Sequence, residues 1–271
     1  MPVVEAHGVR IPTVGFGTWT LRGRECTRLV EQAIRLGYRH IDTAQMYDNE
    51  RAVGQGVHAS GRRAEVFITA KILPENLSPP DLERSVKESL VRLRCSDVDL
   101  LLIHWPNPRI PLAETIGALV KMKREGYARH IGVSNFTVAL IEEATKLSPE
   151  PLVCNQIEYH AYLDQSKVIA ACKAHGMAVV AYSPLARGNA KGDELLARIG
   201  TAHGKSAAQV CLRWLVQQGV AIIPRTSKVE RLAENLALFD FELSAAEMAD
   251  IAGLARRGGR VVDWSYSPKW D

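Results

Sequence analysis

Short apolar runs alternate along the chain with longer stretches whose apolar positions recur every three or four residues. The short runs are rich in Val, Ile and Leu and predict buried strands, whereas the spaced positions predict amphipathic helices. Cys26, Leu29, Ala33 and Ile34, for example, share one helical face before Gly37, a residue that suits a helix C-terminus. The pattern therefore predicts a regular alternation of strand and helix.

Eight strands follow one another from residue 14, each with a helical stretch after it. They are predicted at residues 14–19, 40–42, 66–71, 98–103, 128–133, 152–157, 178–182 and 220–223. Eight such units in a chain of this length are what closure into an α/β (β/α)8 barrel, or TIM barrel, requires. An open doubly wound sheet is the competing arrangement. The G-x-G-x-x-G fingerprint of dinucleotide binding in such sheets is incomplete here. Gly15 and Gly17 match its first two glycines, but Thr20 stands where the third would be.

The remaining segments fit one barrel with small additions. Residues 3–12 predict an N-terminal hairpin with a turn at His7-Gly8, and Ser206 and Ser244 each begin a capping box that predicts a late helix. No Gly, Ser or Pro-rich tract divides the chain. We therefore expect residues 1–271 to form a single domain that ends in a C-terminal tail after Leu254.

Composition and charge exclude several classes of function. The chain of 271 residues is 46% hydrophobic and carries a net charge of +4, with its basic residues scattered, so a nucleic-acid role has little support. There is no signal-peptide pattern and no run of about 18 apolar residues that could span a membrane. These features favour a cytoplasmic protein. Five widely spaced cysteines without a Cys-x-x-Cys pair indicate neither disulfides nor a metal site.

Three consecutive predicted strands end on ionisable residues, namely Asp42, Lys71 and His104, and Tyr47 follows soon after Asp42. Singly, each has an ordinary explanation, as a helix cap, a surface lysine, a core histidine or amphipathic filler. In a barrel, however, active sites lie at the C-terminal ends of the strands. Their joint placement predicts one proton-transfer site.

The chemistry of the four residues is coherent. A tyrosine is a poor acid at neutral pH, but a lysine ammonium beside its hydroxyl makes the proton easier to donate. A buried aspartate would keep Lys71 charged, and a neutral His104 could hold a carbonyl oxygen at Tyr47. Such a site protonates a carbonyl oxygen while hydride reaches the carbon, and a reduced nicotinamide is the natural hydride donor.

The motifs around these residues resemble the aldo-keto reductase family. Asp42-x-x-x-x-Tyr47, Ile68-Thr69-Ala70-Lys71 and Leu101–Pro106 are similar to the family's catalytic tetrad. Further similar segments are Gly132–Phe136, Asn155–His160, Ala181–Leu185, Ile223–Ser227 and Arg231–Asn235. The likeness covers nearly the whole chain. It is greatest to the bacterial branch of 2,5-diketo-D-gluconate reductase B and methylglyoxal reductase.

The resemblance implies a role for each matched residue. Tyr47 becomes the general acid, Lys71 and Asp42 its tuning pair, and His104 the group that orients the carbonyl. The cofactor would be NADPH, with Thr18 among its contacts. Its nicotinamide would be held by Ser134, Asn135 and Gln156 at the carboxamide and by Tyr182 under the ring. Its pyrophosphate would lie along Ser183, Leu185 and Gly188, its 2′-phosphate would contact Arg225, Thr226 and Arg231, and its adenine would contact Glu234 and Asn235.

Two arginines and a hydroxyl at a strand-to-helix junction also suit a phosphate dianion on their own chemistry, and a solvated helix face is the weaker alternative for Arg231. Arg225 and Thr226 stand where the family often has Lys and Ser, so the charge and the hydroxyl are kept. We expect Trp19 and Trp105 to wall the substrate site, with core packing as the alternative for each.

We therefore expect a monomeric enzyme that reduces small-molecule aldehydes and ketones with NADPH, such as methylglyoxal or 2,5-diketo-D-gluconate. One alternative is a Schiff-base aldolase that uses Lys71, which an aspartate that keeps the lysine protonated argues against. Another is a cofactor-bound sensor or subunit with little turnover, which the intact set of four residues argues against.

Overall fold

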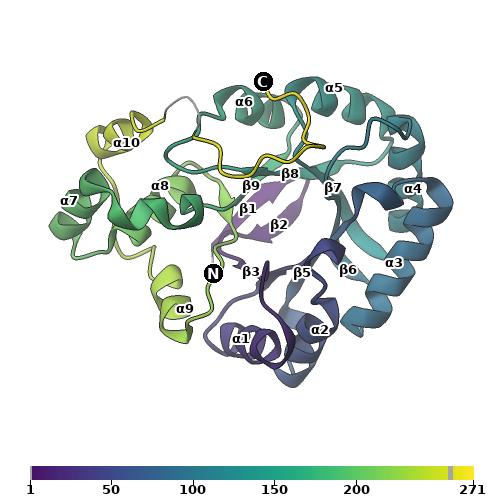
Figure 1. The fold of residues 1–271 in the computed structure, drawn as a ribbon, viewed down its shortest axis with the longest axis horizontal. Coiled ribbons are helices and arrows are strands. Elements are labelled where there is room, and N and C mark those ends of the chain that lie inside the picture. Colours follow the sequence, from purple (N-terminus) through teal and green to yellow (C-terminus); the bar gives the residue numbers. More distant parts are fainter. Residues whose placement is uncertain (1, 256–258) are drawn as a thin grey trace.

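A computed structural model describes residues 2–255 and 259–271, in which a parallel sheet is surrounded by helices (Figure 1). The strands hydrogen-bond in the order β10-β9-β8-β7-β6-β5-β4-β3, and each neighbouring pair is parallel. Their bounds are β3 (Phe16–Gly17), β4 (His40–Asp42), β5 (Phe67–Ile72), β6 (Val98–Ile103), β7 (Ala128–Ser134), β8 (Leu152–Glu158), β9 (Ala178–Tyr182) and β10 (Ala221–Ile222).

The two edge strands of this sheet meet and close it. The amide of Gly15 donates to the carbonyl of Ile222 at 2.8 Å, and the amide of Ile222 donates to the carbonyl of Thr13 at 2.8 Å. Val14 and Ile222 form a parallel bridge at the same seam. The predicted (β/α)8 barrel is therefore confirmed.

The glycine pair at the seam serves this closure. A Cβ atom on Gly17 would lie 2.7 Å from the carbonyl oxygen of Ile223, and one on Gly15 would lie 2.8 Å from Nδ1 of His40. Both distances are shorter than carbon atoms tolerate, so the strands approach this closely only because side chains are missing. Close backbone packing, and not a dinucleotide fingerprint, explains the Gly15-x-Gly17 sequence.

The predicted helices are present, and one further helix appears. The bounds are α1 (Gly23–Arg35), α2 (Glu50–Ala59), α3 (Pro79–Leu93), α4 (Leu112–Arg124), α5 (Val138–Leu147), α6 (Ser166–Ala174), α7 (Glu194–His203), α8 (Ala207–Gln217), α9 (Val229–Leu236) and α10 (Ala245–Ala252). The capping boxes at Ser206 and Ser244 both form. Helix α7, which the periodicity analysis did not predict, lies in the long connection between β9 and α8.

The predicted N-terminal hairpin, β1 (Val3–Ala6) and β2 (Val9–Pro12), plugs the barrel. Its turn uses positive φ values at His7 and Gly8. Its apolar residues form a cluster with inward-facing residues of the barrel strands, and Figure 1 shows it near the centre of the ring of helices. One end of the barrel is thereby filled, which leaves the C-terminal ends of the strands for a site.

The last segment of the chain, residues 259–271, crosses the other end of the barrel (Figure 1, yellow). The side chain of Asp271 accepts from the amide of Val138 at the start of α5. A C-terminal tail after Leu254 is therefore observed, although residues 256–258 of the predicted tail lie outside the described part. In that part, no helix combines the length and apolar character needed to span a membrane.

Candidate active site

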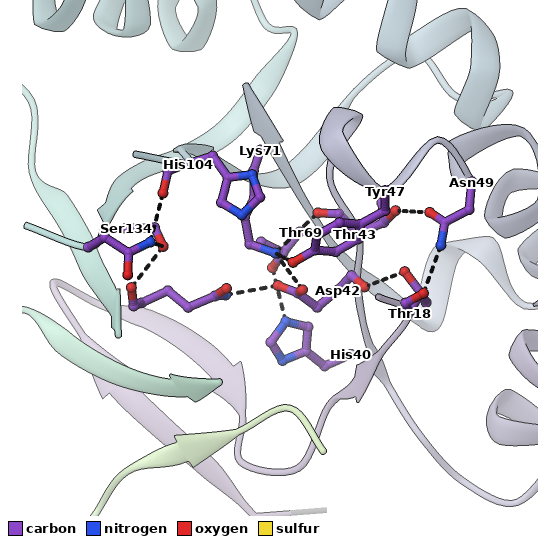
Figure 2. Close-up of polar contacts among 12 residues, drawn as sticks. Thr18, His40, Asp42, Thr43, Tyr47, Asn49, Thr69, Lys71, His104 and Ser134 are labelled. Atoms are coloured by element: carbon purple, nitrogen blue, oxygen red, sulfur yellow. Dashed lines mark hydrogen bonds and ion pairs between the residues drawn. The ribbon is translucent and has the colours of Figure 1, made fainter. Parts of the chain in front are cut away.

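The three ionisable strand ends come together at the open end of the barrel. Asp42 is the last residue of β4, Lys71 is the penultimate residue of β5, and His104 follows β6. Because these strands are hydrogen-bonded neighbours, their side chains meet, as Figure 2 shows. Tyr47 reaches the same point from a 3-10 turn, η1 (Gln45–Tyr47).

Lys71 is the centre of this arrangement and is fully buried. Its Nζ donates to Asp42 Oδ1 at 2.5 Å, to the carbonyl of Thr43 at 3.3 Å and to the hydroxyl of Tyr47 at 3.2 Å (Figure 2). Burial alone would lower the pKa of Lys71, but the charge of Asp42 and the contact with Tyr47 outweigh it and raise that pKa. The lysine therefore stays an ammonium, which makes it unsuited to Schiff-base chemistry.

Tyr47 keeps its proton at neutral pH. Burial raises its pKa above the usual value, and the nearby Lys71 ammonium acts in the opposite direction, as the sequence argument expects, without cancelling the effect of burial. The ring lies edge-on to His104, with 5.6 Å between the ring centroids. Tyr47 is thus a protonated hydroxyl beside a fixed positive charge, which is the arrangement of a general acid.

His104 is neutral for a related reason. Burial, reinforced by the Lys71 charge, holds its pKa well below the ordinary value for histidine. Its Nδ1 atom is buried without a hydrogen-bond partner in the described chain. A neutral imidazole can donate or accept a hydrogen bond at a carbonyl oxygen, and here it faces the cavity that Tyr47 also lines.

That cavity has a volume of about 410 Å³. Besides Tyr47 and His104, its lining includes the apolar and aromatic side chains of Trp19, Met46, Trp105 and Trp264. The rest of the lining is rich in cations, namely Arg187, Lys191, Arg225, Lys228 and Arg231. Within the described residues, none of these five has an ion-pair partner among the carboxylates. A ligand that carries both an anionic group and an apolar part would match this lining.

The resemblance-based cofactor assignments divide into two groups. Those that line the cavity are Asn135, Tyr182, Ser183, Leu185, Gly188, Arg225, Thr226 and Arg231. Those that do not are Thr18, Ser134, Gln156, Glu234 and Asn235. The two predicted substrate walls, Trp19 and Trp105, both line it.

Several residues of the second group instead bind other parts of the protein. Gln156 donates to Asp42 Oδ2 at 2.8 Å, and its carbonyl accepts from the hydroxyl of Ser134 at 2.8 Å. The hydroxyl of Thr18 donates to the carbonyl of Asp42, and Glu234 accepts from Ser206 at 2.6 Å. Gln156 and Thr18 therefore hold Asp42, the partner of the lysine, from two sides.

Sequence reasoning missed some residues at the site. Arg187 and Lys191 belong to η4 (Ala186–Gly192), and Lys228 precedes α9. The guanidinium of Arg187 lies 5.1 Å from the ring centroid of Trp19. The available signal was sequence position: Arg187 and Lys191 lie close to Gly188, which the resemblance assigned to a pyrophosphate, and Lys228 lies two residues after Thr226, which it assigned to the 2′-phosphate.

Asn49 is a further residue that the sequence did not indicate. Its buried amide donates to the carbonyls of Thr18 at 2.7 Å and Leu21 at 3.1 Å, and its oxygen accepts from the hydroxyl of Thr43. These bonds tie the loop that carries Trp19 to the loop that carries Tyr47, and Figure 2 shows those to Thr18 and Thr43.

Comparisons with known proteins agree with this geometry. The model of the "Aldo/keto reductase family" matches residues 13–256. The "Methylglyoxal reductase DkgB" of Escherichia coli O157:H7 is 43% identical over 265 residues, which cover 96% of this chain and 99% of that protein. The "Glyoxal reductase" of Bacillus subtilis (strain 168) is 42% identical over 250 residues, covering 92% and 90%.

A solved structure named as a candidate 2,5-diketo-D-gluconic acid reductase B superposes with a TM-score of 0.98. It is 47% identical in sequence, and the match covers 100% of this chain and 98% of the other. The agreement therefore includes the tail as well as the barrel.

Proposed function

This chain belongs to the aldo/keto reductase family, and from that membership we propose that it reduces small carbonyl compounds with NADPH and uses Tyr47 as the general acid. The observation that carries the proposal is the contact of Tyr47 with the buried Lys71, itself held by Asp42, at the wall of a cavity whose lining includes five cations. The relatives named for methylglyoxal, glyoxal and diketogluconate reduction support small, polar dicarbonyls as substrates.

The cavity fits a phosphorylated nicotinamide cofactor. Five cations without carboxylate partners line it in the described chain, and phosphate groups are the anions that arginine and lysine bind most readily. Arg225, Thr226 and Arg231 would contact a 2′-phosphate, and Ser183, Leu185 and Gly188 would lie along a pyrophosphate. A reduced nicotinamide held there by these residues would supply the hydride for the carbonyl carbon.

The residues of the chain supply the other half of the reaction. His104, neutral and turned to the cavity, orients the carbonyl oxygen toward Tyr47. Tyr47 donates its proton to that oxygen as negative charge develops on it, and the adjacent Lys71 ammonium stabilises the phenolate that remains. Asp42 keeps the lysine charged throughout. At the carbonyl end of the cavity, which is the part around Tyr47 and His104, Lys71 and Trp105 are buried, and the low dielectric constant of such surroundings strengthens these electrostatic interactions.

The test is loss of NADPH absorbance with methylglyoxal, 2,5-diketo-D-gluconate and an aromatic aldehyde, for the wild-type chain and Tyr47→Phe. We expect the variant to lose at least about a hundredfold in kcat, the usual contribution of a general acid, while its Kd for NADPH stays within about twofold. Tyr127→Phe is the matched control, because Tyr127 packs beside Lys87 away from the cavity.

Retention of most activity by Tyr47→Phe would refute the general-acid assignment. A wild-type chain that binds NADPH and reduces none of the carbonyls would favour a cofactor-bound sensor instead. Borohydride trapping of a carbonyl on Lys71 would revive the aldolase alternative.

A further inference from the structure

Glu158, the last residue of β8, is a fully buried carboxylate that takes no part in the reaction above. Its Oε1 accepts from the amide of Val261 at 2.6 Å, and its Oε2 accepts from the amide of Val262 at 2.8 Å. The Arg260 guanidinium is 3.9 Å away. A buried carboxylate needs such donors, and here the C-terminal tail provides most of them.

The other partner of Glu158 comes from the barrel. His160 Nε2 lies 2.9 Å from Oε1, and His160 Nδ1 accepts from the amide of Tyr162. Since Nδ1 accepts, the ring proton lies on Nε2 and points at the carboxylate. His160 thereby fixes the orientation of Glu158, so that both of its oxygens are aligned with the two tail amides.

Beyond this attachment, the tail builds part of the wall around the carbonyl end. Val262 and Trp264 line the cavity that Tyr47 and His104 share. Tyr266 packs edge-on against Trp105, with 5.6 Å between centroids, and Trp270 contacts the same ring at 6.1 Å. The position of this aromatic wall depends on where the tail leaves the barrel.

The tail has a second attachment at its far end, which is weaker. The carboxylate of Asp271 accepts from the amide of Val138 at 3.1 Å, but this contact is exposed to solvent. Water competes with exposed hydrogen bonds, whereas the bonds that Glu158 accepts from Val261 and Val262 are part-buried and buried, respectively, and both are charge-assisted. Glu158 is therefore the principal anchor.

We propose that Glu158 is a positioning residue that fixes the C-terminal tail over the carbonyl end of the cavity, and so determines how well larger carbonyl substrates bind. The proposal rests on the proposed function, because the substrate occupies the end that the tail encloses. Bulky substrates would contact Trp264, whereas methylglyoxal is small enough to be held by Tyr47 and His104 alone.

Glu158→Gln is the sharpest single change. The amide keeps the size of the side chain but has one acceptor oxygen, and its NH2 group would face a backbone N–H. We expect the tail amides around Val261 and Val262 to exchange hydrogen at least about tenfold faster, the usual effect of losing a buried charge-assisted bond.

Activity gives a second, independent readout. For Glu158→Gln, the KM for phenylglyoxal should rise about tenfold relative to that for methylglyoxal, while kcat for methylglyoxal and the Kd for NADPH change less than about threefold. A purely structural role would reduce the active fraction equally for both substrates and leave their ratio unchanged.

Asp99→Asn is the matched control. Asp99 is also a buried carboxylate that accepts from a backbone amide, that of Ile68, and pairs with an arginine, Arg63, but it lies near the opposite end of its strand. It should lower stability without altering tail exchange or the substrate ratio. If Glu158→Gln does not fold, Val262→Pro removes one of the two amide donors and leaves the carboxylate in place.

Unchanged exchange in the tail would overturn the anchor, and faster exchange with an unchanged substrate ratio would overturn its effect on specificity. If the wild-type chain reduces no carbonyl, the proposed function fails, whereas the exchange measurement still decides whether Glu158 holds the tail.

Discussion

The interior of the barrel holds charged and neutral groups side by side because their partners differ. Lys71 keeps its charge through Asp42. Burial lowers the pKa of His40, an effect that Asp42 opposes without cancelling, and His40 Nε2 hydrogen-bonds with the hydroxyl of Thr69 at 2.9 Å. Burial and the Lys71 charge lower the pKa of His104 further below the usual range. Because the folded state lowers the pKa of both histidines, they reduce the free energy of unfolding in acid, whereas Lys71, whose pKa is raised, does not.

We expect the free energy of unfolding to fall as the pH drops below about 6.5, the ordinary histidine pKa. In this range the unfolded chain binds protons that the folded His40 and His104 refuse, so unfolding takes up protons and becomes easier. Each histidine contributes up to about 1.4 kcal/mol per pH unit. His104→Gln should reduce the slope by about that amount, measured by urea unfolding across a pH series.

His58→Gln is the control for this series, because His58 is exposed on α2. It should leave the slope unchanged. An identical slope for His104→Gln and the wild-type chain would show that His104 binds protons as readily in the folded state as in the unfolded state, and would contradict the lowered pKa.

At the scale of elements, helix α2 matters because it follows the Tyr47 loop directly and packs between two neighbours. A Cβ on Gly56 would lie 2.6 Å from the carbonyl oxygen of Thr27 in α1. A Cβ on Gly54 would collide with the backbone of Leu93, the last residue of α3. The two glycines are thus contact surfaces that bring α2 close to both helices.

Gly54→Ala and Gly117→Ala should change stability in opposite directions. Both glycines are helical, and alanine is favoured in helices by about 1 kcal/mol. At Gly117 in α4 nothing lies within 4 Å of an added Cβ, so that gain should appear in full. At Gly54 the collision with Leu93 should outweigh it and cost about 2 kcal/mol or more. Thermal unfolding of both variants measures the difference, and stabilisation by Gly54→Ala would refute the close contact.

The elements themselves were largely predictable, because apolar period, caps and turn residues act locally. Helix α7 was missed although Asp193 caps it and Gly204, at φ +64°, ends it; its apolar positions are few and follow an irregular connection. That connection could not be predicted, since Ser183 and Arg187 adopt positive φ values that their side chains do not favour. Ser183 and Arg187 line the cavity because the backbone of this connection follows that irregular course.

The same distinction applies to the site. Asp42, Lys71 and His104 were predictable because parallel strands deliver their last residues to one end of a barrel. The bond from Gln156 to Asp42 was not, since it joins β8 to β4 across the barrel interior. Such contacts depend on the curvature and closure of the whole sheet, which no local pattern contains.

The molecule as a whole is polarised along the barrel axis. The N-terminal hairpin fills one end with apolar side chains, and the C-terminal tail encloses the other with aromatic ones. The cavity is lined by cations from separate segments, among them Lys191 in η4 and Arg231 in α9. The pKa of Lys191 is lowered mainly by burial, and the nearby charge of Arg231 lowers it further. The fold thus brings cations from separate segments together in one cavity, where an anionic ligand would be favoured.

The affinity for NADPH should therefore depend on salt more steeply than the affinity for NADH. The two cofactors differ by one 2′-phosphate, so only NADPH carries the extra charge that Arg225 and Arg231 would face under the proposed function, and added salt would screen that attraction. Arg231→Met should weaken the binding of NADPH about tenfold or more, the effect of losing a charge-assisted bond, and that of NADH much less.

Lys191→Met should also weaken the binding of NADPH, because Lys191 lines the same cavity as Arg231. Quenching of tryptophan fluorescence by each cofactor over a salt series measures both effects, with the exposed Arg35→Met as control. Equal losses for NADPH and NADH would place Arg231 at a phosphate that both cofactors share, and the preference for NADPH would then need another source.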